Sequence, residues 1–241
     1  MVWNQGFEPT KQLNILLAVI TVLAFAWILG GQIASLRLAD RTVTVRGAAE
    51  MPVVADLATW SLNFSSTGNE LAAAQRELGQ NLEKTRTFLQ GFGIRADEIE
   101  MQSISVNDAW ANAYGSDVQG RPRYTVSGGL TVRTTSLQGA LEAKNGLGKL
   151  IGSGVVLTSS YGPNFAFTQL NDKKLELVSR ATAEAKKAAV QFAKDSGSRL
   201  GGIRRARQGS VEILGRDSFV AESEQINKVL RVVTTVDYDV R

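Results

Sequence analysis

Four carboxylates lie close together in the sequence and are the residues of this chain best suited to chemistry: Asp97, Glu98, Glu100 and Asp108. A pair of carboxylates can act as general acid and general base, and a cluster can hold a divalent cation. The first three fall between an expected helix and an expected strand, where such residues more often form a solvated turn. They are candidates for a carboxylate-dependent enzyme, and the solvated turn is the simpler explanation.

Two missing residue types restrict every other kind of chemistry. The chain contains no histidine and no cysteine. It therefore lacks the most common general base and metal ligand, and it cannot form disulfides, thiolate zinc sites or iron–sulfur clusters. No phosphate-binding loop and no G-x-S-x-G motif is present. We expect no catalytic residue, no cofactor and no metal site, and hence a protein that is not an enzyme.

A second group of residues is suited to binding a partner. Residues 107–123 interrupt an expected hairpin with Gly, Asn and Pro and carry two aromatic side chains, which either cover the domain's own core or contact a partner. The densest basic run, at residues 199–207, could meet anionic lipid or an acidic partner, although a solvated edge strand is the commoner explanation. It lacks interleaved aromatics, so we expect no nucleic acid as a partner. The candidate oligomer or partner contacts are Trp110, Tyr114, Arg121, Arg123, Arg204, Arg205 and Arg207.

The strongest single pattern is the segment 12–36, which carries no ionisable side chain. About 20 apolar residues cross the hydrocarbon core of a bilayer. A cleavable signal peptide has a shorter apolar region followed by small residues around the cut, and residues 30–35 fit such a site poorly. We expect a short tail at 1–11 and an uncleaved transmembrane signal-anchor helix at 12–36 that contacts the lipid bilayer.

The orientation of this anchor does not follow from charge. The charges on its two sides nearly balance, and the Lys/Arg count alone would place the large domain inside the cell. A short tail followed by a long globular domain is instead the layout of a signal anchor whose domain lies outside the cytoplasm. The remaining residues, 37–241, are enough for one large or two small packed units.

The period of the apolar residues predicts the elements that must position these side chains. Alternation predicts strands at 42–47, 58–65, 99–106 with a bulge, 124–132, 155–157, 165–167, 203–214 and 230–240. The first two strands are expected to separate near Met51 and Pro52. Helical spacing predicts helices at 69–92, 136–151 and 171–196. The third helix should bury a stripe that includes Leu175, Ala185 and Phe192. The order of elements indicates an α+β fold in which antiparallel or mixed sheets are covered by helices.

Several short segments also occur in a characteristic order. They are residues 43–50 followed by 56–59; 89–94 followed by 97–99; Tyr124 with 130–132; 181–188 leading to 200–201; and 232–238. Together, from about Arg41 to Tyr238, they resemble the SIMPL-domain family of bacterial envelope proteins. The resemblance implies an α+β fold, an extracytoplasmic location, a tendency to homo-oligomerise, and a loose link to oxidative-stress defence and envelope integrity. It supplies no catalytic residues.

The expected protein is therefore a non-enzymatic homo-oligomer, tethered by a single pass in the inner membrane with its domain in the periplasm. Its expected role is an envelope scaffold or stress-protective interaction protein, arranged as a ring or cage over the membrane and open to other envelope proteins as partners. Many members of the resembled family carry a cleavable signal instead, so the anchor argues against a free periplasmic assembly. The alternatives are the carboxylate-dependent enzyme and a module that binds a small apolar ligand or lipid. The latter would need an enclosed cavity between sheet and helices.

Overall fold

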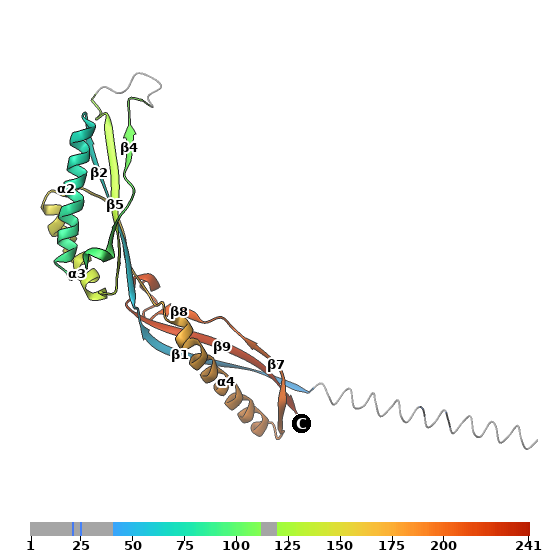
Figure 1. Cartoon of the computed structure of the whole chain (residues 1–241). Coiled ribbons are helices and arrows are strands. Elements are labelled where there is room, and N and C mark those ends of the chain that lie inside the picture. Colours follow the sequence, from blue (N-terminus) through green and yellow to red (C-terminus); the bar gives the residue numbers. More distant parts are fainter. Residues whose placement is uncertain (1–20, 22–24, 26–40, 112–119) are drawn as a thin grey trace, which may run out of the picture. The chain divides into compact units, whose positions relative to one another are not determined.

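The computed structural model of this chain describes residues 21, 25, 41–111 and 120–241 (Figure 1). Of the expected transmembrane segment, Thr21 and Phe25 are described, and both are helical. The rest of that segment, the tail at 1–11 and the candidate Tyr114 lie outside the described residues. Among the residues that are described, no helix is both long and apolar enough to span a bilayer.

The chain divides into two compact units. Unit 1 contains residues 1–48, 180–209 and 233–241, and unit 2 contains residues 49–179 and 210–232. Three long elements contribute residues to both units: β1 (Thr42–Val54), α4 (Leu170–Asp195) and β9 (Asn227–Val240). The elements agree with the expected α+β class.

The sheet of unit 2 has the strand order β3-β5-β2-β6, with β4 also paired to β5. Its strands are β2 (Leu57–Gly68), β3 (Ile99–Met101), β4 (Ser105–Asp108), β5 (Tyr124–Thr134) and β6 (Leu157–Ala166). Every one of these pairings is antiparallel. In the central pair, Trp60 lies opposite Val132 and Leu62 opposite Leu130, so alternate apolar residues share one face.

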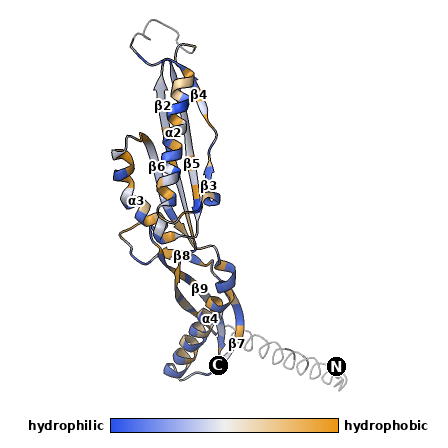
Figure 2. Cartoon of the chain, turned by 60° about the vertical axis from the view of Figure 1, so that its left-hand side comes forward, coloured by the Kyte–Doolittle hydropathy of each residue, from blue (hydrophilic) through white to orange (hydrophobic). Residues whose placement is uncertain are grey.

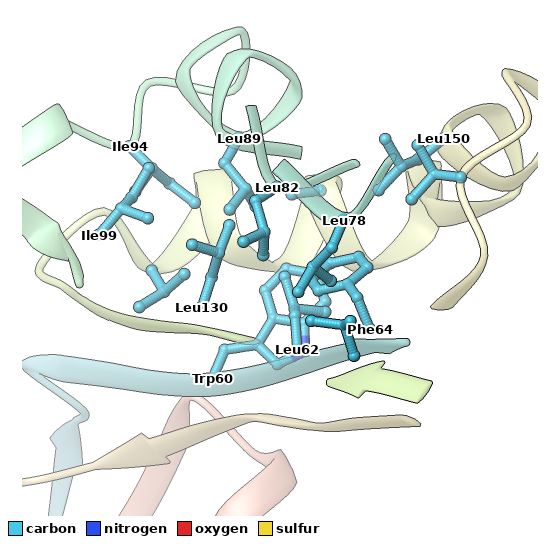
Figure 3. Close-up of a cluster of buried hydrophobic side chains, with 14 of the residues drawn as sticks. Trp60, Leu62, Phe64, Leu78, Leu82, Leu89, Ile94, Ile99, Leu130 and Leu150 are labelled. Atoms are coloured by element: carbon cyan, nitrogen blue, oxygen red, sulfur yellow. The ribbon is translucent and has the colours of Figure 1, made fainter. Parts of the chain in front are cut away.

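Two helices, α2 (Leu71–Gln90) and α3 (Leu137–Gly152), pack over that apolar face (Figure 2). The core between helices and sheet is formed by large side chains from several elements, which point toward one another (Figure 3). Its most buried members include Trp60, Leu62, Phe64, Leu78, Leu89, Ile94, Leu130 and Val132. Trp60 Nε1 donates a hydrogen bond of 2.8 Å to Ser160 Oγ on β6, which satisfies the indole inside this core.

Unit 1 is built on a second sheet with the order β1-β9-β7, where β7 spans Leu200–Gln208. A further short strand, β8 (Glu212–Gly215), pairs with the part of β9 that belongs to unit 2. In unit 1, Ala185 and Ala189 of α4 pack on Val43, Val45 and Val236 of the sheet. The alanines let the helix come close to the strands, and at Gly47 the helix backbone itself touches β1.

The three predicted helices are confirmed within two residues at each end, but several strand boundaries are wrong. Met51 and Pro52 lie inside β1, and the break falls at Ala55 and Asp56. Because β1 is an edge strand with a neighbour on one side only, it can accommodate a proline. In the same way β6 runs continuously through Gly162 and Pro163, since it is also an edge strand.

Two further predicted strands are each divided in the structure. The strand expected at 99–106 is β3 and β4, separated at Gln102, whose side chain donates to Ser61 Oγ (2.8 Å) and Thr131 Oγ1 (3.0 Å). The strand expected at 203–214 is β7 and β8, separated near Gly209, whose N–H donates to Val233 O. A hydrogen bond to a neighbouring strand thus replaces regular pairing at both breaks.

The predicted buried stripe of α4 is wrong at its ends. Leu175 is 82% exposed and Phe192 is 53% exposed. The buried positions of the helix recur every four residues, and after Leu177 all of them are alanines: Ala181, Ala185, Ala189 and Ala193. The prediction placed the large apolar residues on the packed face of α4, but close packing of the helix on the sheet favours small residues there.

Candidate functional site

The best-formed polar site among the described residues lies where β4 ends and β5 begins. There the guanidinium of Arg123 donates to Asp108 Oδ2 from Nε (3.1 Å) and from Nη2 (3.0 Å). The Arg123 Cζ atom lies 5.4 Å from the ring centroid of Trp110 and 4.8 Å from that of Tyr124. These four residues, which we name the Arg123 cluster, join an ion pair to two cation–π contacts.

Backbone hydrogen bonds fix the Arg123 cluster in place. The N–H groups of Trp110 and Ala111 donate to Asp108 Oδ1, and the Ala109 N–H donates to Arg123 O. The Arg123 N–H donates to Asn69 Oδ1, just before α2. Trp110 remains 50% exposed above these hydrogen bonds. The arrangement therefore presents an aromatic face to solvent, while the carboxylate at its base is occupied by hydrogen bonds.

The ion pair shifts the pKa values of both of its partners, Asp108 and Arg123. The hydrogen bond from Arg123 lowers the pKa of Asp108 below its ordinary value, although partial desolvation opposes the shift, and the same hydrogen bond raises the pKa of Arg123. Because the pKa of Asp108 is depressed by folding, its stabilising contribution is present at pH values above the unfolded-state pKa. It is lost as the pH falls through the folded-state pKa.

Asp108→Asn is therefore expected to lower the urea midpoint of unfolding at neutral pH and to have little effect once the pH lies below the pKa of Asp108 in the folded protein. Urea unfolding of wild type and variant across the acid range measures this. A difference between the two proteins that stayed constant down to the lowest pH would show that the Asp108 charge contributes nothing through Arg123.

The structure brings together only part of the predicted contact set. Trp110 and Arg123 meet in the Arg123 cluster, and Arg121 is exposed nearby in the chain. Arg204, Arg205 and Arg207 are exposed on β7 and belong to unit 1. The sequence marks Asp108 only as a candidate acid–base residue and does not mark Tyr124 as part of a site. The signal that could have joined these two residues is the hairpin itself, because Asp108 lies opposite Tyr124 in the β4–β5 register.

Two of the other candidate carboxylates, Asp97 and Glu98, stabilise a turn, whereas Glu100 is exposed on β3. Arg95 Nε donates to Asp97 Oδ1 at 3.0 Å. Glu98 Oε2 accepts from the Arg95 N–H (2.9 Å) and from Thr134 Oγ1 (2.9 Å), which ties the 3-10 turn η1 (Ala96–Glu98) to β5. Within the described part of the chain, no group of three or more acidic residues is arranged to hold a metal ion. These bonds assign Asp97 and Glu98 a structural role.

An apolar groove between α2 and α3 was not predicted. It is open to solvent and has a volume of about 860 Å³. Phe88, Phe92 and Leu150 provide apolar side chains, and Glu83, Lys84 and Lys149 provide charged ones. The rings of Phe88 and Phe92 pack edge to face with centroids 5.0 Å apart. We name this feature the α2–α3 groove; it is not the enclosed cavity between sheet and helices that a carrier of a small apolar ligand would need.

A glycine on α3 gives the phenylalanine rings their space. A Cβ atom at Gly146 would lie 3.0 Å from Phe92 Cζ and 3.3 Å from Phe88 Cζ. Helical spacing predicted the helix at 69–92, but it gave no sign that Phe88 would remain half-buried beside an open groove. That outcome depends on where α3 crosses α2.

Comparisons with known proteins identify a family and little else. The family model described as "SIMPL: Protein of unknown function (DUF541)" matches residues 43–231. No curated protein matches the chain. A crystal structure of an uncharacterized conserved protein from Listeria innocua is 13% identical, with 76% of this chain and 91% of that chain covered and a TM-score of 0.21. A second, of a hydrolase from Listeria innocua, is 12% identical, with 76% and 90% covered and a TM-score of 0.25. TM-scores this low support no conclusion about activity.

Proposed function

Because the chain belongs to the SIMPL family, we propose that it is a non-enzymatic homo-oligomer, tethered to the inner membrane, that acts as an envelope scaffold or stress-protective interaction protein. The observation that carries the proposal is the Arg123 cluster. It uses a carboxylate and a guanidinium to hold an exposed tryptophan rigidly, which is the construction of a contact surface. Tryptophan and arginine are the side chains most enriched at the energetic centres of protein interfaces.

The connectivity of unit 1 supports the tether. Val240 N–H donates to Arg41 O, and Arg199 and Arg241 exchange backbone hydrogen bonds of 2.6 and 2.9 Å. The start of β1, the start of β7 and the end of β9 therefore meet at one end of the sheet. Only residues 37–41 separate this end from the segment 12–36, and five extended residues reach about 17 Å. An anchor at 12–36 would hold this end of the sheet close to the membrane surface.

A common membrane plane would favour assembly. Copies anchored in one bilayer share their orientation and are confined to two dimensions, which raises their effective concentration for contacts between domains. A modest contact surface such as the Arg123 cluster can then support an oligomer that would be weak in free solution.

The oligomeric state of the full-length protein in lipid nanodiscs or mild detergent tests the proposal. We expect one discrete multimer by native mass spectrometry and by light scattering, over a wide range of protein concentration. A monomer at all accessible concentrations would overturn the proposed scaffold.

Trp110→Ser is expected to weaken this assembly about tenfold or more, because truncating an interface tryptophan commonly costs more than 1 kcal/mol. Tyr161→Ser is the matched control, since Tyr161 is an aromatic of unit 2 that is 66% exposed on β6. Dissociation curves of both variants in the same detergent measure the difference. Equal curves for wild type and the Trp110 variant would exclude Trp110 from the interface.

The absence of cysteine makes the proposed location easy to test. A single Ser210→Cys substitution in the exposed segment of unit 2 between β7 and β8 should react with a membrane-impermeant maleimide in intact spheroplasts. Labelling that required lysis of the cells would place the domain on the cytoplasmic side instead.

A further inference from the structure

One large apolar side chain of unit 2 projects almost completely into solvent. Phe219 is 96% exposed and its neighbour Val220 is 43% exposed. Single exposed apolar residues are common and need no explanation when they lie on a loose loop. Phe219 differs because the loop that carries it is braced, as the hydrogen bonds of Asp217 and Gln225 show.

The brace consists of one carboxamide and one carboxylate. The Asp217 N–H donates to Gln225 Oε1 (2.8 Å), and Gln225 Nε2 donates to Asp217 O (2.6 Å) and to Val220 O (2.7 Å). The Phe219 N–H donates to Asp217 Oδ1 (2.9 Å). Gly215 leaves room for the brace, because a Cβ there would lie 2.3 Å from Gln225 Nε2.

The other side of the loop is also attached to unit 2. Glu222, at the start of the 3-10 turn η2 (Glu222–Glu224), accepts from Nζ of the buried Lys228 through its backbone oxygen at 2.6 Å and also through its carboxylate. Glu224 lies 3.9 Å from Lys144 Nζ of α3. Because the loop is fixed at both ends, its backbone has little conformational entropy left to lose when Phe219 binds, which favours Phe219 as an anchor residue.

The α2–α3 groove of the same unit is a suitable receptor for such a ring. Its volume of about 860 Å³ exceeds that of a phenylalanine side chain, and Phe88 and Phe92 offer ring faces and edges for aromatic packing. The 96% exposure of Phe219 shows that the ring does not occupy the groove of its own chain.

We propose that the Phe219 loop of one copy docks into the α2–α3 groove of the next copy. Charge supports a second copy as the occupant. The loop carries exposed Arg216 and Asp217, and the groove carries Glu83 together with Lys84 and Lys149, so each sign on the loop can meet its opposite on the groove. The inference rests on the proposed homo-oligomer and names a further contact within it, in addition to the Arg123 cluster.

The contact has a definite symmetry. A loop that binds a different surface of its neighbour forms a heterologous interface, which closes into a ring if the rotation between copies allows it and otherwise continues as an open array. Both partners belong to unit 2, so every copy in one membrane plane carries one free loop and one free groove for the same interaction.

Mixed disulfide cross-linking tests this arrangement in the full-length protein, which has no cysteine of its own. Ser218→Cys places a thiol beside Phe219 and keeps the ring, and Thr87→Cys places one in the groove. When the two single variants are coexpressed in one membrane and oxidised mildly, we expect a covalent dimer that contains one of each. Either variant alone should give none, whereas an isologous contact between like surfaces would cross-link a single variant.

Two further changes separate docking from misfolding. Phe219→Ser in the Ser218→Cys chain should reduce the mixed dimer at least tenfold, while Phe192→Ser on α4, a residue that is 53% exposed, should not reduce it. Glu83→Arg in the Thr87→Cys chain and Arg216→Glu in the Ser218→Cys chain should each lower the yield of mixed dimer. When both changed chains are coexpressed, the two charges are exchanged across the contact and the yield should be restored.

The outcomes distinguish this inference from the proposed function. If the protein is multimeric but the mixed dimer does not form, or forms equally with Phe219→Ser, the docking of Phe219 is wrong and the scaffold stands. If the protein is monomeric in the membrane mimetic, both are wrong. Two results together support the contact as proposed. The mixed dimer should be lost with Phe219→Ser, and the dimer lost with a single charge change should return when Glu83→Arg and Arg216→Glu are combined.

Discussion

Gly47→Ala is expected to displace α4 from β1 in unit 1. A Cβ atom at this position would lie 2.1 Å from Ala181 O and 2.3 Å from Ala185 N, and these are backbone atoms of the helix that cannot turn aside. Overpacking of a core commonly costs about 1–3 kcal/mol, and we expect a value near 3 kcal/mol or above, since the whole helix must move. Hydrogen exchange measured by mass spectrometry should show faster exchange in the part of α4 from 180 to 195.

Gly79→Ala is the matched control for this change. Gly79 lies on the exposed side of α2, and a Cβ there would meet no atom within 4 Å. The added methyl should therefore stabilise the protein by about 0.5–1 kcal/mol through helix propensity. If both alanine variants behaved alike, α4 would not pack against β1 at Gly47.

The role of Gly47 illustrates what the sequence could not show. Alternation and helical spacing are local signals, and they predicted the three helices and the strand at 58–65, in which Trp60, Leu62 and Phe64 are buried. Gly47 looks like any glycine in a strand, because the residues that forbid a side chain there lie far along the chain in α4. For the same reason the pattern selected Leu175 and Phe192 for the packed face of α4, where alanines are buried instead.

The Arg123 cluster and the Phe219 loop show the same limit: the sequence identifies single residues, but not the contacts between residues that are distant in the chain. The sequence identified Trp110, Arg123 and Asp108 separately, because aromatic, basic and acidic residues are visible one at a time. Their assembly depends on the register that sets Asp108 opposite Tyr124. No helix or strand was predicted at 217–225, and neither the brace formed by Gln225 nor the exposure of Phe219 follows from the composition of this segment.

Trp60→Ala is expected to be the most destabilising single substitution in unit 2. Trp60 is 1% exposed at the centre of the core between the sheet and its helices (Figure 3). Truncating a buried aromatic residue to alanine costs about 3–5 kcal/mol, from lost burial and from the cavity that remains. Since the total stability of a domain is about 5–15 kcal/mol, urea unfolding should show a large loss or a unit that no longer folds.

Two conservative variants separate the contributions of the ring and its hydrogen bond. Ser160→Ala removes only the acceptor for Trp60 Nε1 and leaves a buried N–H without that partner, at an expected cost of about 1–3 kcal/mol. Trp60→Phe removes the N–H but keeps much of the ring, so it should fall between wild type and Trp60→Ala in urea unfolding. If Trp60→Ala cost no more than Ser160→Ala, the indole would act through its hydrogen bond to β6 alone. A clearly larger cost for Trp60→Ala would show that the ring holds α2, β2 and β5 together by packing.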